Sequence, residues 1–275
     1  MNPDGGRDGG RGGRDGGRGG RDARRGGRDA KREAMASFDE VADAYLDSDV
    51  HRAGEDLNTL AEWAADASRA LDVACGAGHT ANALAEAGVP AVVAADATPR
   101  MVRTATANFP VAGAVADAER LPFASGSFDA VTCRVAAHHF PDPEAFVREV
   151  SRVLAPGGTF AFEDVAAPED PELAAFVNRF EALRDGSHVE AHPLSRWESW
   201  LRDAGLAVER ATTGRLDLDF ADWVDRTDPL AADRERLAEL VRTPEAAEAY
   251  EVAIEDGEVT EFSNVKALIR AKKRT

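Results

Sequence analysis

Lysine and cysteine are scarce in this chain of 275 residues, and no apolar run approaches the ~18 residues of a membrane-spanning helix. The two cysteines, Cys75 and Cys133, exclude a disulfide framework, and neither stands at metal-ligand spacing from other candidate ligands. No secretory signal is recognised in the sequence. We therefore expect a cytoplasmic protein with no metal site and no membrane span.

Charge is divided unevenly along the chain. Residues 1–34 carry 10 Lys and Arg against 6 Asp and Glu, a net of +4, so the remainder of a chain of net −17 carries −21. Beyond residue 34 the only lysines are Lys266, Lys272 and Lys273. This acidic, lysine-poor body is typical of a salt-adapted protein and lacks the basic face that nucleic acid requires. We expect no nucleic-acid partner for it.

The first 34 residues differ from the rest in composition. They hold 12 of the 24 glycines and no residue able to nucleate a hydrophobic core. The composition predicts a disordered Gly/Arg/Asp-rich tail over 1–34 and a folded domain over 35–275. Arg-Gly-rich segments can bind RNA through charge and stacking, which leaves RNA binding by the tail as an alternative.

The stretch from Leu71 to Thr80 organises the folded part. It predicts a buried strand, then a turn containing Gly76 and Gly78, then the start of a helix whose free N–H groups point at the turn. A dinucleotide site would need a third glycine in the spacing G-x-G-x-x-G, which is missing. The carboxylate of Asp72 would repel a pyrophosphate, but it suits a ligand that carries an ammonium group.

The same stretch resembles the first motif of class I S-adenosylmethionine-dependent methyltransferases, an acidic residue followed by G-x-G-x-G. Ala74 stands where that family has its first glycine. The ammonium group of S-adenosylmethionine would account for Asp72. Taken alone, the motif leaves a purely structural strand–turn–helix equally open.

Two later strands also end on carboxylates. Residues 91–95 predict a strand ending on Asp96, whose carboxylate can accept both ribose hydroxyls of a nucleoside or cap the turn. The strand over 111–116 ends on Asp117, in the run D-A-x-x-L-P-F. Asp117 and the Ala118 N–H can supply a polar edge for adenine, and this run is similar to the adenine-binding loop of methyltransferases. NAD-binding folds do not require it.

The motifs after residue 127 extend the resemblance. F-D-x-V, H-H-F-x-D-P and L-x-P-G-G follow in order over 128–158. Together they resemble the small-molecule methyltransferases that include the ubiquinone/menaquinone C-methyltransferases (the methyltransferase type 11 group), over roughly residues 37–212. Alternating strands and helices independently predict a mostly parallel α/β sheet. The resemblance implies a doubly wound, seven-stranded Rossmann-like sheet of order 3-2-1-4-5-7-6 and a set of cofactor-binding residues: Asp72, Ala74, Gly76, Gly78, Asp96, Ala97, Asp117, Ala118 and Arg134.

The sequence gives less specific signals for the acceptor site than for the cofactor site. The loop after the fourth strand abuts the methyl group in this fold and carries His138 and His139, either of which could take a proton or merely orient the loop. We expect one of the two to point away. Residues 164–204 predict a helical lid and 217–256 an acidic helical insertion. Four residues are candidates for contacting substrate or stitching the lid together: Tyr45, His51, Arg184 and His188.

The sequence thus predicts an enzyme that transfers a methyl group from S-adenosylmethionine to a small organic acceptor by direct displacement. The protein would mainly align the acceptor with the methyl group. Two alternatives remain open. One is an RNA methyltransferase that uses the tail, and the other is a non-catalytic protein that binds the cofactor.

Overall fold

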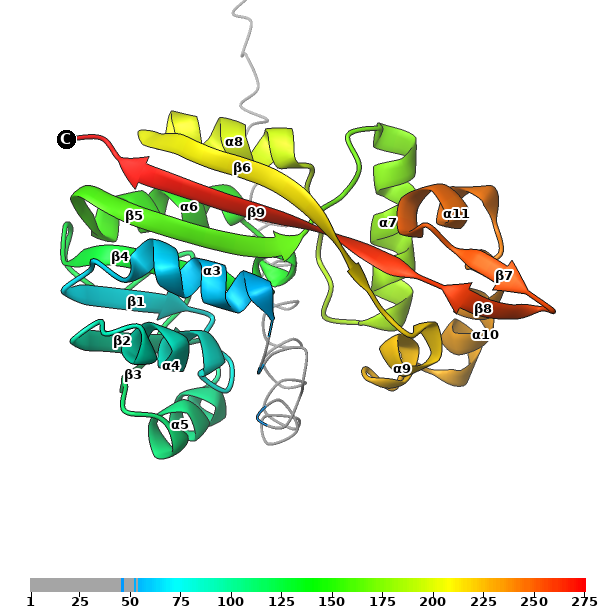
Figure 1. Cartoon of the computed structure of the whole chain (residues 1–275), viewed down its shortest axis with the longest axis horizontal. Helices are drawn as coiled ribbons and strands as arrows, with labels where there is room; N and C mark the ends of the chain where they lie inside the picture. The colour runs from blue at the N-terminus through cyan, green and yellow to red at the C-terminus, as the bar shows by residue number, and fades with distance from the viewer. Residues whose placement is uncertain (1–45, 47–51, 53) are drawn as a thin grey trace, which may run out of the picture.

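A seven-stranded sheet forms the centre of the computed structural model, which describes residues 46, 52 and 54–275 (Figure 1). Its strand order is β3-β2-β1-β4-β5-β9-β6; the first five pair in parallel, and β9 is antiparallel to both neighbours. The expected order is confirmed, with β9 in the seventh-strand position. The strands of this sheet are β1 (Arg69–Val73), β2 (Ala91–Asp96), β3 (Ala112–Val115), β4 (Phe128–Arg134), β5 (Leu154–Val165), β6 (Leu206–Asp217) and β9 (Ser263–Lys273). Strands β7 (Ala253–Glu255) and β8 (Glu258–Glu261) pair with each other in a separate hairpin.

Helices cover both faces of this sheet, as a doubly wound fold requires. Successive side chains of a strand point to opposite faces, so Leu71 of β1 joins a core with α6 and α8, while Ala70 joins one with α3, α4 and α5. The helices are α3 (Glu55–Ala64), α4 (His79–Glu86), α5 (Pro99–Asn108), α6 (Pro143–Val153), α7 (Pro171–Arg184), α8 (Leu194–Asp203), α9 (Phe220–Asp225), α10 (Ala231–Leu240) and α11 (Pro244–Tyr250).

Another core lies beside the sheet, in addition to the two on its faces. The long strands β6 and β9 run out of the main sheet into a lobe built from α7, α9, α10, α11 and the β7–β8 hairpin (Figure 1). We call these elements the helical lobe. Its core is aromatic, with Phe180 fully buried and stacked on Trp223 at 5.7 Å between ring centroids. The acidic stretch 217–256 therefore forms three helices and then enters a hairpin.

The expected lid over 164–204 divides between the helical lobe and one face of the main sheet. Helix α7 contributes Phe176 and Phe180 to the helical lobe. Helix α8 packs on the sheet instead, because its Trp197 and Leu201 are buried against the main core. Only the first half of the segment therefore belongs to the helical lobe. Within the described part of the chain, no helix is long and apolar enough to cross a bilayer.

Candidate cofactor and acceptor site

The glycine turn between β1 and α4 has the conformation that its sequence suggests. Gly76 has φ +51° and Gly78 has φ +99°, both in the region that glycine adopts without strain. A Cβ on Gly78 would lie 2.7 Å from the Cβ of Ala105, so α5 packs against bare backbone there. A Cβ on Gly76 would meet nothing within 4 Å. Gly76 therefore borders open space where a ligand can approach the backbone.

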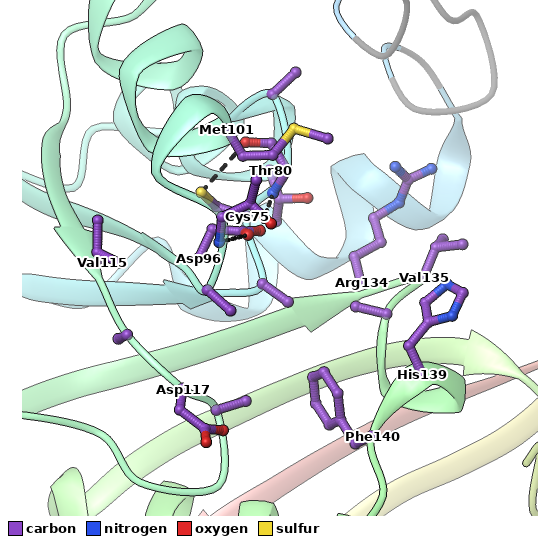
Figure 2. Close-up of a pocket in the computed structure, with 18 of the residues that line it drawn as sticks. Cys75, Thr80, Asp96, Met101, Val115, Asp117, Arg134, Val135, His139 and Phe140 are labelled. Carbon is purple, nitrogen blue, oxygen red and sulfur yellow. Dashed lines mark hydrogen bonds between the residues drawn. The ribbon is translucent and has the colours of Figure 1, made fainter. Parts of the chain in front are cut away.

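That open space is part of a cavity of about 300 Å³ at the carboxyl ends of β1 to β4 (Figure 2). Eight of the residues expected at the site belong to its wall: Ala74, Gly76, Asp96, Ala97, Asp117, Ala118, Arg134 and His139. Gly78, Asp72 and His138 are not among the residues that line it. Ligands bind at this edge in open α/β sheets, at the point where the strand order reverses.

Asp72 lies directly beneath the glycine turn. Thr132 Oγ1 donates to Asp72 Oδ1 at 2.7 Å, while Oδ2 is buried and has no hydrogen-bond partner in the described part of the chain. Burial raises the pKa of this carboxyl to about 7, and the Thr132 hydrogen bond offsets only part of that rise. An orphaned carboxylate oxygen under an open glycine turn fits a cationic group such as the ammonium of S-adenosylmethionine.

Asp96, at the end of β2, already has partners. Its Oδ2 accepts the Gly76 N–H at 3.0 Å and its Oδ1 accepts the Thr98 N–H at 2.8 Å. The carboxylate therefore ties the glycine turn to the neighbouring strand end, which is the capping role. Each carboxylate oxygen has a second acceptor site, and Asp96 belongs to the cavity wall, so binding of ribose hydroxyls stays a prediction.

The far end of the cavity offers an apolar bed that the sequence reasoning missed. Val115 is 55% exposed, although it ends a strand of the main sheet, and Met101 of α5 also lines the wall. Asp117 Oδ1 accepts the Glu119 N–H at 3.0 Å, which shapes the loop next to Val115. The sequence showed only an apolar residue near the end of the strand before the Asp117 loop. Its exposure inside a cleft, which suits a flat ring, is visible only in the structure.

His138 and His139 have different surroundings. His138 is buried, its Nδ1 lies 2.6 Å from Asp164 Oδ1, and its backbone N–H donates to Asp164 Oδ2 at 2.9 Å. Burial lowers the pKa of His138, but the carboxylate of Asp164 outweighs burial, so the net shift is upward. His139 instead lines the cavity beside Val135 and Phe140 (Figure 2). Of the two histidines, His139 alone lines the cavity.

His139 is held by the loop after α7. Its Nδ1 lies 3.0 Å from the Ser187 carbonyl oxygen and 3.2 Å from Ser187 Oγ. A carbonyl oxygen can only accept, which assigns the proton of the neutral ring to Nδ1 and the lone pair to Nε2. Burial, reinforced by the neighbouring His138 at 4.0 Å between ring centroids, lowers the pKa of His139 to about 4.

Arg134 connects the cavity to the start of helix α3. Its Nε lies 2.7 Å from Asp56 Oδ2 at the start of α3 and 3.8 Å from Glu163 Oε2. The buried Glu163 also pairs with Lys266 of β9 at 3.1 Å. Arg134 therefore lines the cavity with its guanidinium group ion-paired on two sides.

The remaining acceptor candidates lie elsewhere. Tyr45 and His51 fall outside the described residues. Arg184 packs inside the helical lobe, 4.6 Å above the Trp223 ring centroid and 3.3 Å from Glu181, so it stitches the lobe together and does not face the cavity. His188 Nε2 lies 2.9 Å from Asn178 Oδ1 and the residue does not line the cavity; burial lowers its pKa to about 3. No cluster of three or more metal-binding side chains occurs in the part of the chain that the structure describes.

Comparisons with known proteins agree with this fold. A family model for the methyltransferase domain matches residues 71–162, the glycine turn through β5. The uncharacterized methyltransferase YcgJ of Bacillus subtilis is 40% identical over 208 residues, which cover 72% of this chain and 81% of YcgJ. The crystal structure of YcgJ aligns with a TM-score of 0.75 over 80% of this chain and 98% of YcgJ. A crystal structure from Bacillus halodurans C-125, also assigned as a methyltransferase, is 36% identical with a TM-score of 0.75 and covers 81% of this chain and 100% of its own.

Proposed function

This chain belongs to the class I S-adenosylmethionine-dependent methyltransferases of the small-molecule type, and from that membership we propose that it methylates a compact organic acceptor held against His139. The observation that carries the proposal is that His139 and the glycine turn line one cavity. A cofactor on the turn and an acceptor beside the imidazole would then be in contact. The acceptor would lose its proton at His139.

The residues that would hold the cofactor follow from their partners. Asp72 Oδ2 would accept from the ammonium group, and the bare backbone at Gly76 would allow close approach. Asp96 would accept from the ribose hydroxyls through its remaining lone pairs. The adenine ring would rest on Val115, with its amino group directed at Asp117. The bound cofactor supplies a methyl group on a sulfonium, which is already a good leaving group.

The state of His139 restricts the acceptor. With the Nδ1 proton engaged by Ser187, Nε2 carries the lone pair that can accept a proton. A pKa of about 4 keeps the ring neutral at physiological pH but makes it a weak base. Such a base suits an acidic acceptor, for example a phenolic or enolic hydroxyl or an activated carbon, and suits an aliphatic alcohol poorly.

Calorimetry with a matched pair of variants tests the proposal. The wild type should bind S-adenosylmethionine and S-adenosylhomocysteine but not NAD. His139→Asn keeps a donor for Ser187 and loses Nε2, so cofactor affinity should stay within about threefold while turnover of a panel of phenols, catechols and 1,3-diketones falls at least about 100-fold. His192→Asn, which changes a histidine outside the cavity wall, should retain turnover. Binding of NAD without S-adenosylmethionine would overturn the cofactor assignment, and full turnover by His139→Asn would remove the base role.

A further inference from the structure

Two apolar residues at the cavity are held in a strained backbone conformation. Ala74 has φ +53° and Val135 has φ +51°, and both belong to the cavity wall. The other non-glycine residues with positive φ in the described part of the chain are the acidic residues Asp228, Glu251 and Asp256. A left-handed conformation is uncommon for any residue with a Cβ and is a clear outlier for a β-branched one. Val135 therefore occupies a position where glycine would be the unstrained choice.

The surroundings of Val135 hold this conformation from both sides. Its N–H donates to the Glu163 carbonyl oxygen of β5 at 2.9 Å. The preceding residue, Arg134, is ion-paired with Asp56 and Glu163, and the following residue, Ala136, accepts the His139 N–H at 3.0 Å. Strain that the surroundings enforce is found mainly at functional sites. The side chain so placed lines the cavity beside His139 (Figure 2).

We propose that Val135 is the specificity-determining residue at the methyl-transfer end of the cavity, where its isopropyl group leaves room for a methyl group on the sulfonium but not for a larger alkyl group. The inference rests on the proposed function, which puts the reacting methyl group near His139. Val135 is the branched apolar side chain next to His139 on this wall. A glycine at this position would relieve the backbone strain and would also remove the isopropyl group. The side-chain volume and the backbone strain therefore change together in Val135→Gly.

Cofactor homologues measure this room without requiring the acceptor. Wild-type protein should bind S-adenosylmethionine at least about tenfold more tightly than S-adenosylethionine, because one extra methylene must be fitted against Val135. Val135→Gly and Val135→Ala should both bring the ratio to within about threefold. S-adenosylhomocysteine, which lacks the alkyl group, should bind all proteins alike. The alanine variant keeps a Cβ at positive φ, so a loss of discrimination shared with glycine would come from lost volume.

Asp256→Gly is the matched control, because Asp256 has the same left-handed φ of +51° but does not line the cavity. It should retain wild-type discrimination. Val135→Gly should raise the melting temperature by about 2–4 °C as strain is relieved. Wild-type discrimination in Val135→Gly, or equal loss of discrimination in Asp256→Gly, would overturn the proposal. Failure of the wild type to bind either S-adenosylmethionine or S-adenosylhomocysteine would instead overturn the proposed function.

Discussion

The core around the glycine turn and the core of the helical lobe are built on different principles. Around the glycine turn, the core consists mostly of alanine and valine, and the cavity is shaped by backbone and by two short carboxylates. The helical lobe is held by large rings, with Phe180, Trp223, Tyr250 and Phe262 all buried in one cluster. A site made by backbone depends on φ angles and close approach, which only certain residues allow. A lobe made by ring packing tolerates many sequences of similar volume.

The largest expected effect would show whether the two cores are independent. Phe180→Ala removes a fully buried ring from the helical lobe and should cost about 3–5 kcal/mol of unfolding free energy. Hydrogen exchange should quicken in α7, α10 and α11 while β1 and β2 keep most of their protection, because regions open as separate cooperative units. Affinity for S-adenosylmethionine, measured well below the melting temperature, should stay within about threefold. A parallel loss of protection in β1 would mean that the two cores form one cooperative unit.

The same contrast explains what the sequence could predict. The glycine turn and Asp96 at the end of β2 follow from spacings that the backbone geometry enforces, whereas the strand order was implied by the family resemblance. Which of His138 and His139 lines the cavity could not be read from the sequence, because consecutive residues of a short turn are directed by tertiary partners such as Asp164 and Ser187.

The helical lobe was the least predictable part. The acidic residues over 217–256 predicted helix, yet the chain turns into a hairpin at 253–261, because a solvated surface looks alike in both structures. Arg184 carried no signal that it would pack over Trp223 inside the lobe. Both outcomes depend on long-range packing, which local patterns do not report.

Two glycines with similar φ angles test whether the core around the glycine turn depends on its backbone conformation. Gly78 and Gly88 have φ +99° and +96°, but only Gly78 is crowded by α5. Gly78→Ala combines left-handed strain with overpacking and should cost about 2–4 kcal/mol and abolish measurable cofactor binding. Gly88→Ala should cost about 1–2 kcal/mol from strain alone and leave cofactor affinity unchanged. Equal costs in chemical denaturation would show that the approach of α5 is not what requires glycine.

Substitution of Asp72 tests whether the core around the glycine turn gives up folding stability in order to bind the cofactor. With a folded pKa of about 7 against an ordinary value of 3.8, the folded state holds more protons than the unfolded state between these pH values. Stability of the cofactor-free protein should therefore fall as pH rises from about 4 to 7 and level off above that range. Asp72→Asn should remove this contribution and melt higher than wild type at pH 8.

The same variant should lose affinity for S-adenosylmethionine at pH 8 by about 1.5–3 kcal/mol, roughly 10- to 150-fold, because the ammonium group loses a charged acceptor. At pH 5 the wild-type carboxyl is protonated, so the gap between the two proteins should narrow. The control is Asp129→Asn, since Asp129 accepts the N–H groups of Ser68 and Arg69 at the start of β1 and should alter stability alone. Wild-type affinity that does not rise with pH would argue against contact between Asp72 and the ammonium group.

The smallest expected effect is at residues 1–34, which lie outside the described residues. Their net charge of +4 faces a body of −21, so phosphate would be repelled wherever the tail is not. Deleting them should leave melting temperature and cofactor affinity unchanged, because they contain nothing that either core could bury. RNA binding by the full chain should be weak and should fade with added salt, since it would rest on counterion release. Filter binding with both forms across a salt series measures this. Tight, salt-resistant RNA binding by the shortened protein would mean that it has a local basic groove despite its net negative charge. The acceptor would then be RNA.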